Sequence, residues 1–220
     1  IMYSIETKSL TKKYKDKIVV SNLNLKIKEG ELFSLLGTNG AGKTTTIKML
    51  SSLIVPTEGD IIIDKFDMKK NKQKIKEIIN ISPQITSLAP NLTVRENLEF
   101  IAGAYQIKNK EQKIKELVDM FDLSKIMDQK AKTLSGGWQR KLSIAMSLIN
   151  DPKILFLDEP TLGLDVISRK ELWKIIESKK GKMTIILTTH YMEEAEHLSD
   201  KIGIIVDGIL LDEDTPKALK

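Results

Sequence analysis

The chain of 220 residues contains no cysteine, which excludes disulfide bonds, thiol catalysis and cysteine-based zinc sites, and which fits a cytosolic protein. It also lacks any apolar run near the ~18 residues that a membrane-spanning helix needs. The longer apolar runs, such as Ile154–Leu157 and Ile202–Val206, have the length of strands. No signal peptide is expected, because residues 11–17 are polar where its apolar core would begin. We therefore expect any role at a membrane to come through a partner.

Charge of one sign does not dominate the chain either. Lys and Arg number 35 against 30 Asp and Glu, and the net charge of +5 permits a nucleic-acid or anionic-membrane partner without requiring one. The densest basic run comprises Lys65, Lys69, Lys70, Lys72, Lys74 and Lys76. Because surface lysines are common and Glu77 lies nearby, we expect a solvated face here, with attraction to an anionic membrane or a nucleic acid as the alternative.

The order of apolar and polar segments predicts an α/β fold, in which strands and helices alternate. Several of the expected strands are apolar throughout, as in parallel sheets that are buried on both faces. The expected strands are Leu32–Leu36, Ile61–Ile63, Ile78–Ile81, Ile154–Leu157, Thr184–Thr188 and Ile202–Val206.

The first thirty residues follow a different pattern. Residues 3–10, 18–20 and 22–28 are expected to form short strands joined by polar turns. Within the last of these, Leu23, Leu25 and Ile27 alternate with polar residues, which is the period of a half-exposed strand. The pattern indicates a small antiparallel sheet beside the main one.

The strand signal disappears between residues 85 and 150. Thr93 and Glu96 form a capping-box pattern before a helix, and Ser168 with Glu171 repeats that pattern for a later helix. We therefore expect one domain over residues 1–220, with 1–84 and 151–220 as the catalytic core and its β subdomain, and 85–150 as an inserted α-helical subdomain.

A glycine-rich segment between an expected strand and an expected helix matches the pattern G-x-x-x-x-G-K-[ST]. Its backbone N–H groups and the following helix N-terminus can hold phosphates. Lys43 can reach the β- and γ-phosphates, and the Thr44 hydroxyl can ligate Mg²⁺. The cofactor-binding residues expected here are Gly37, Thr38, Asn39, Gly40, Ala41, Gly42, Lys43, Thr44 and Thr45.

Two carboxylates end the apolar strand Ile154–Leu157. Parallel strands bring their carboxyl ends to one edge, so Asp158 and Glu159 are expected beside the phosphate loop. Asp158 can hold Mg²⁺ directly or through water, and Glu159 can orient and deprotonate an attacking water.

The segment Leu134–Arg140 resembles the signature motif of ABC-family ATPases, and further motifs of that family follow in order over nearly the whole chain. The resemblance implies a P-loop NTPase core with a mainly parallel sheet, an N-terminal antiparallel β subdomain and the helical insert. Trp138 departs from the usual glutamine of the signature, and Thr38 from the usual proline of the phosphate loop.

The same resemblance implies roles for residues that would be unremarkable alone. Tyr14 resembles the aromatic residue that stacks on adenine, and Gln84 the glutamine that contacts Mg²⁺ or the attacking water. Asp165 belongs to the family's D-loop, and His190 is similar to its switch histidine. A second anion site is expected where Ser135, Gly136 and Gly137 open a helix. The resemblance implies that this site faces the γ-phosphate bound to a second subunit.

Segments around Leu98, Asp165 and Glu196 resemble the exporter branch of the family. The expected function is therefore an Mg²⁺-dependent ATPase subunit, binding ATP, that powers a separate membrane permease and pairs head to tail with a second copy or a homologous ATPase. It would lie peripherally at the cytoplasmic face of the cell membrane, with no nucleic-acid partner. The alternatives are a soluble ABC ATPase that acts on ribosomes or DNA, and a nucleotide sensor that hardly turns over.

Overall fold

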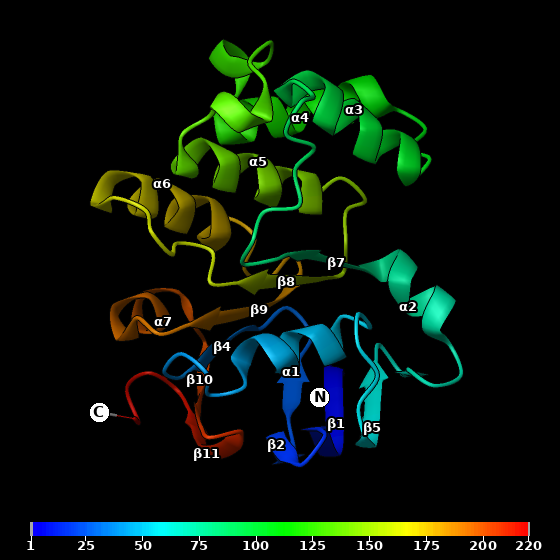
Figure 1. Ribbon diagram of the computed structural model, residues 1–220, viewed down its shortest axis with the longest axis vertical. Coiled ribbons are helices and arrows are strands. Elements are labelled where there is room, and N and C mark those ends of the chain that lie inside the picture. Colours follow the sequence, from blue (N-terminus) through cyan, green and yellow to red (C-terminus); the bar gives the residue numbers. More distant parts are fainter. Residues whose placement is uncertain (1, 220) are drawn as a thin grey trace.

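The computed structural model describes residues 2–219, which form an α/β fold with two sheets and seven α-helices (Figure 1). The strands are β1 (Tyr3–Tyr14), β2 (Lys17–Leu23), β3 (Lys26–Lys28), β4 (Leu32–Leu36), β5 (Glu58–Ile63), β6 (Phe66–Asp67), β7 (Ile79–Ser82), β8 (Ile154–Asp158), β9 (Thr184–Thr189), β10 (Lys201–Val206) and β11 (Ile209–Asp214). The helices are α1 (Lys43–Leu50), α2 (Lys72–Ile78), α3 (Val94–Ala104), α4 (Lys110–Phe121), α5 (Gly136–Ser147), α6 (Val166–Glu177) and α7 (Met192–Leu198). Among these residues no helix combines the length and the apolar character that crossing a bilayer requires.

The main sheet has the order β11-β10-β4-β9-β8-β7, in which only the edge strand β11 pairs antiparallel. Its central strands β4 and β8 both neighbour β9 and run in the same direction. Their carboxyl ends therefore lie at one edge of the sheet, with β9 between them. This arrangement brings the residues that follow β4 close to those that end β8.

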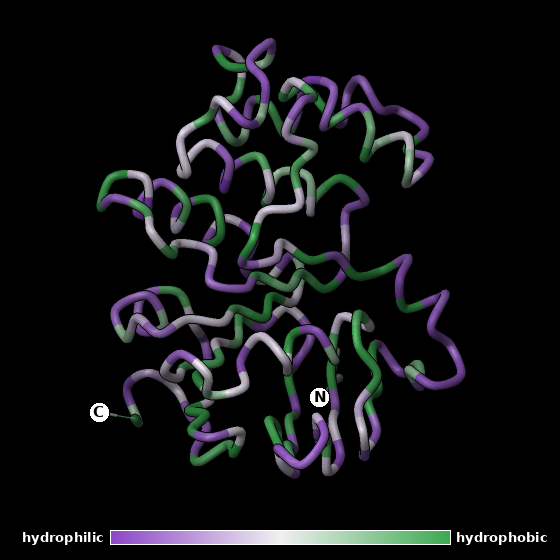
Figure 2. Tube along the Cα trace, in the orientation of Figure 1, coloured by the Kyte–Doolittle hydropathy of each residue, from purple (hydrophilic) through white to green (hydrophobic). Residues whose placement is uncertain are grey.

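Both faces of the main sheet are covered, which explains the uninterrupted apolar strands. Along β8, Leu155 and Leu157 join the cluster beneath the helices α3 to α6, whereas Ile154 and Phe156 join the cluster that contains α1 and the second sheet. Alternate side chains of a strand point to opposite faces, so burying both faces requires apolar residues at every position. In Figure 2 the hydrophobic stretches accordingly follow the strands in the middle of the molecule.

The second sheet is antiparallel, as the first thirty residues predict. It has the order β2-β1-β5-β6, with β3 also paired to β1. The single strand expected over 22–28 is wrong, because β2 ends at Leu23 and β3 begins at Lys26. Asn22 has a φ of 49°, and the Leu25 N–H is bound by the Thr7 hydroxyl rather than by a strand, so the chain turns between the two strands.

Residues 85–150, all of which are described, contain helices and no strand of the two sheets. The capping box that opens α3 is confirmed: the Thr93 Oγ1 accepts the Glu96 N–H, and the Glu96 carboxylate accepts the Thr93 N–H at 2.7 Å. The helix α5 packs on β7, where the Ser143 and Ser82 hydroxyls are 2.9 Å apart. The domain limits at residues 84 and 150 remain a prediction.

The expected cap at Ser168 is wrong. Helix α6 begins one turn earlier, and its N-cap is Asp165, whose Oδ1 accepts the N–H groups of Ile167 and Ser168. The Ser168 hydroxyl also donates to Asp165, and these hydrogen bonds lower the pKa of the Asp165 carboxyl. Ser168 thus lies within the first turn of α6 and cannot form a capping box with Glu171, whose carboxylate makes a 2.7 Å ion pair with Lys141 of α5. Helix α2 is absent from the elements that the sequence predicts, and the strand predicted from Ile78 begins one residue later, at Ile79.

Candidate functional site

The loop between β4 and α1 has the backbone geometry of an anion-binding turn. Gly40 and Gly42 adopt φ values of 82° and 101°, which other residues rarely adopt. A Cβ on Gly42 would lie 2.7 Å from the Val19 carbonyl oxygen of β2. Only glycine fits at position 42, because the backbone is left-handed there and β2 approaches too closely for a side chain. Gly42 is also the N-cap of α1.

Lys43, the first residue of α1, is 5% exposed. Its Nζ donates to the carbonyl oxygens of Gly37 at 2.6 Å and Thr38 at 3.0 Å, and it lies 3.1 Å from the Glu159 Oε1. A buried ammonium group held at the mouth of a helix N-terminus is suited to bind phosphate oxygens.

Asp158 and Thr44 meet at the carboxyl edge of the main sheet. Asp158 is 2% exposed, and its Oδ1 accepts hydrogen bonds from the Thr188 hydroxyl at 2.6 Å and the Thr44 hydroxyl at 3.2 Å. Neighbouring ligands of an octahedral Mg²⁺ lie about 3 Å apart, so these two oxygens fit such an ion. No cluster of three acidic or His ligands occurs within residues 2–219. An ion here would take its remaining ligands from phosphates and water, as Mg²⁺ commonly does.

Glu159 lies between Lys43 and His190. Its carboxylate is 4% exposed, with Oε1 near the Lys43 ammonium and Oε2 2.9 Å from the His190 Nδ1. Its φ of 49° is in the left-handed region, and its N–H is held by the backbone and the hydroxyl of Thr188. Strained backbone at a non-glycine residue is typical of functional sites. Because a carboxylate only accepts, the His190 Nδ1–H donates to it.

Gln84 lies beside the phosphate loop in the folded chain. It lines a cavity of 230 Å³ together with residues of the loop, including Lys43 and Thr44, and with Glu159. Arg140 of α5 fixes this segment by donating to the carbonyl oxygens of Pro83 at 2.8 Å and Gln84 at 2.6 Å. Burial lowers the pKa of Arg140, and the nearby Asp158 charge opposes that shift.

The predicted signature residues and Asp165 lie elsewhere, at the N-termini of α5 and α6. Ser135 is the N-cap of α5, and a Cβ on Gly137 would lie 3.3 Å from the Ser168 hydroxyl of α6. Within residues 2–219 no hydrogen bond or ion pair joins Ser135 or Asp165 to the phosphate loop. Trp138 is half-buried against the core, and the Lys141 ammonium lies 4.5 Å from the centre of its ring.

Tyr14 ends β1 at the hairpin with β2 and is 48% exposed. The Lys12 ammonium lies 5.0 Å from the centre of its ring. Val19 of the same hairpin contributes to the lining of the phosphate-loop cavity. Tyr14 itself is outside that lining.

Sequence reasoning missed Arg140, Thr188 and Glu194. Glu194 of α7 is fully buried, and its Oε1 accepts hydrogen bonds from the Thr161 hydroxyl at 2.7 Å and the Trp173 Nε1–H at 3.0 Å. It thereby ties the segment after Glu159 to the helix that follows His190. Only the contacts between distant segments show this role, so the sequence alone held no signal for it.

We expect Glu194→Ala to lower the free energy of unfolding by about 3 kcal/mol, because two buried donors lose their acceptor. Glu194→Gln keeps an acceptor oxygen and should cost about 1 kcal/mol. Urea unfolding followed by circular dichroism measures both. Equal losses for the two variants would show that these hydrogen bonds do not stabilise the fold.

The ABC transporter family model matches residues 20–162. The chain is 42% identical to the probable multidrug ABC transporter ATP-binding protein YbhF of Escherichia coli, over 98% of the chain but 38% of that protein. It is 39% identical to the Nod factor export ATP-binding protein I of Burkholderia orbicola, over 98% of the chain and 72% of that protein. A solved dimeric ATP-binding cassette bound to ADP and Pi superposes with a TM-score of 0.88 and 28% identity, covering 96% of this chain and 98% of the other.

Proposed function

The chain belongs to the ABC transporter family as an ATP-binding domain, and we propose that it hydrolyses ATP with Mg²⁺ to drive a separate membrane permease, most simply an exporter. The observation that carries the proposal is the contact of Glu159 with both Lys43 and His190 beside the phosphate loop. A general base, a phosphate-binding cation and an imidazole are thereby joined in one buried cluster.

In this proposal the amides that follow Gly37 and the Lys43 ammonium bind and orient the β- and γ-phosphates. Asp158 and Thr44 would hold Mg²⁺, which would neutralise charge that develops on the phosphates. Glu159 accepts the proton of the attacking water, and the His190 Nδ1–H keeps that carboxylate oriented. Gln84 borders the same cavity and is proposed to contact the metal or the water.

A second copy of the chain, or a homologous ATPase, is proposed to complete the site. The chain has one phosphate loop and one signature segment, and these lie apart in the fold. Beside the signature segment, Val166 and Ile167 of α6 are 62% and 72% exposed, although both are apolar. Such side chains next to Ser135 and Asp165 suit a face that another subunit covers. Head-to-tail pairing would bring this face to the other subunit's phosphate loop.

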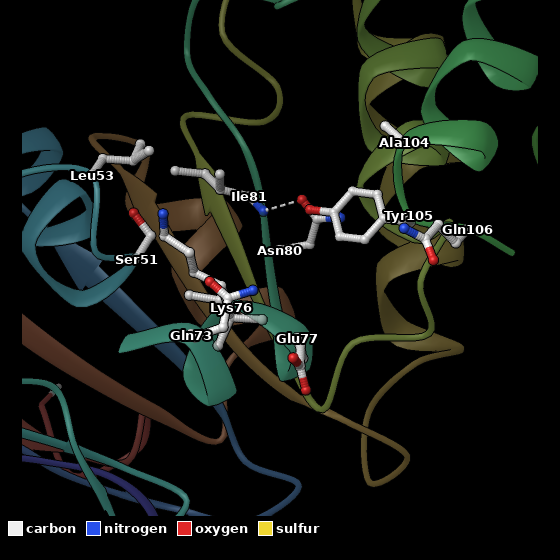
Figure 3. A pocket seen from close by; sticks show the side chains of 11 residues that line it. Ser51, Leu53, Gln73, Lys76, Glu77, Asn80, Ile81, Ala104, Tyr105 and Gln106 are labelled. Atoms are coloured by element: carbon white, nitrogen blue, oxygen red, sulfur yellow. Dashed lines mark hydrogen bonds between the residues drawn. The ribbon is translucent and has the colours of Figure 1, made fainter. Parts of the chain in front are cut away.

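The permease is proposed to dock in a groove on the side of β7 (Figure 3). The groove has a volume of 580 Å³ and is lined by the ends of α1 and α3, by α2 and by β7. Tyr105 follows α3, and burial raises the pKa of its hydroxyl. Because β7 runs directly into Pro83 and Gln84, a segment bound in the groove would contact the strand that positions Gln84. With a permease bound in this groove, the chain is proposed to lie peripherally at the cytoplasmic face of the membrane.

Purification from native membranes in mild detergent with Mg-ATP tests this function. Tagged chain carrying Glu159→Gln should retain a stoichiometric multi-span membrane protein, identified by mass spectrometry. Adding Ala104→Arg should abolish the co-purification of that protein, because the bulky cation fills the groove. The control Ser124→Arg, at an exposed position elsewhere in the helical segment, should leave the co-purification unchanged. Ribosomal proteins or DNA in place of a membrane protein would favour the soluble branch of the family.

A further inference from the structure

We propose that the chain also contacts an anionic lipid bilayer directly, through a surface formed by the loop after α1 and the lysines that precede and open α2. We call it the basic loop surface and define it by Leu53, Val55, Lys69, Lys70 and Lys72. The inference goes beyond the proposed function, because attachment through a permease does not require this chain to touch lipid.

The loop holds two apolar side chains out into solvent. After α1, the N–H groups of Leu53 and Ile54 both donate to the Lys48 carbonyl oxygen. Ile54 packs against the core, whereas Leu53 and Val55 on either side of it are 58% and 69% exposed. The Lys12 ammonium donates to the Val55 carbonyl oxygen at 2.7 Å and fixes the loop. The exposed side chains therefore belong to an ordered loop.

The lysines beside this loop are exposed and largely unneutralised. Lys69 pairs with Asp60 at 2.6 Å, and this partner raises the pKa of Lys69. Lys70 and Lys72 are exposed, and neither takes part in an ion pair among residues 2–219. Two further acids lie close by: Asp67 accepts the backbone N–H of Lys69, and Glu77 of α2 lines the neighbouring groove together with Leu53.

The apolar loop and the lysines adjoin one another. Val55, Ile54 and Met68 line an apolar cavity of 280 Å³ together with Lys69 and Lys72. In Figure 2 the hydrophilic stretch that leads into α2 lies at the right of the molecule. The neighbouring groove in Figure 3 also includes Leu53, so the basic loop surface and the proposed permease groove adjoin.

Apolar tips surrounded by lysines match the chemistry of a membrane interface. Leu53 and Val55 can enter the boundary between headgroups and acyl chains, while the lysine stems extend along it and their ammonium groups reach lipid phosphates. Each lysine near an anionic membrane contributes about fivefold in affinity. A nucleic acid would use the same charges but would gain nothing from two exposed aliphatic side chains, since its backbone is polar.

Sedimentation with vesicles tests the inference on the full chain. We expect binding to vesicles of phosphatidylglycerol and phosphatidylcholine, little binding to phosphatidylcholine alone, and weakening by salt. The triple variant Lys69→Gln, Lys70→Gln, Lys72→Gln should lose at least about tenfold in affinity. The matched variant Lys115→Gln, Lys125→Gln, Lys130→Gln removes the same charge from the helical segment and should change little. Val55→Ser should reduce the binding that persists at high salt.

Three results would overturn the inference: no binding of the wild-type chain to anionic vesicles, equal losses in the two triple variants, or preference for a DNA duplex over vesicles. ATP affinity is measured in parallel on every variant, because none of these side chains contacts the phosphate loop. A variant that loses vesicle binding but keeps its ATP affinity would show that the substitution affects the lipid contact alone. Unchanged vesicle binding in a chain that does not bind ATP would instead challenge the proposed function alone.

Discussion

Glu159→Gln is expected to accumulate as an ATP-bound dimer and to hydrolyse ATP about 10³-fold more slowly than the unchanged chain. The amide keeps the volume of the carboxylate and an oxygen that can face the Lys43 ammonium. It cannot take a proton from water, so the nucleotide remains intact between the subunits. Losing the negative charge also removes repulsion between this residue and the γ-phosphate.

Light scattering after size-exclusion chromatography, with and without Mg-ATP, measures the dimer, and phosphate release measures turnover. Glu193→Gln provides the control, because Glu193 is exposed on α7 and the substitution changes the same charge. A Glu159→Gln chain that stays monomeric at saturating Mg-ATP would contradict the proposed pairing. Unchanged turnover would instead show that Glu159 is not the base.

The glycine-rich loop after β4 and the strand that ends in Asp158 were predictable as structural elements, because the information for both is local. Glycine spacing, an apolar run and a following helix define the loop, and parallel strand direction brings β4 and β8 to one edge. The contact between Glu159 and His190 could be expected only through the family resemblance. Nothing in the residues around either one specifies a 2.9 Å separation.

The two capping boxes show where local patterns fail. Thr93 with Glu96 and Ser168 with Glu171 have the same spacing, yet only the first caps its helix. Near the second, Asp165 caps the helix one turn earlier by accepting two backbone N–H groups, and Lys141 from a distant helix holds Glu171 in an ion pair. The competing partner lies thirty residues away, so a pattern of four residues cannot reveal it.

The buried contacts of Arg140 and Glu194 were unpredictable for a related reason. Each side chain satisfies groups on segments remote in sequence: Arg140 binds the carbonyls before α3, and Glu194 binds Thr161 and Trp173. A lone arginine or glutamate in a helix is usually a solvated residue. Only the packing of α5 on β7, and of α7 near α6, distinguishes Arg140 and Glu194 from the solvated arginine and glutamate residues of the chain.

Lys43→Ala is expected to weaken ATP binding by at least about 100-fold, because two charge-assisted contacts to phosphate oxygens are lost. The same substitution should lower the free energy of unfolding by about 3 kcal/mol, because the Glu159 carboxylate loses a partner while 4% exposed. Binding of a fluorescent nucleotide and urea unfolding measure the two effects. Lys48→Ala on the exposed side of α1 should change neither.

The double variant Lys43→Ala, Glu159→Gln separates these effects. Removing the carboxylate charge relieves the cost of leaving it buried without a cation, so most of the lost stability should return. Nucleotide affinity should stay low, because no ammonium group reaches the phosphates. A double variant that regained both stability and nucleotide affinity would show that Lys43 acts only through Glu159 and the fold. Unchanged nucleotide affinity in Lys43→Ala alone would refute the assignment of the loop after β4 as the phosphate site.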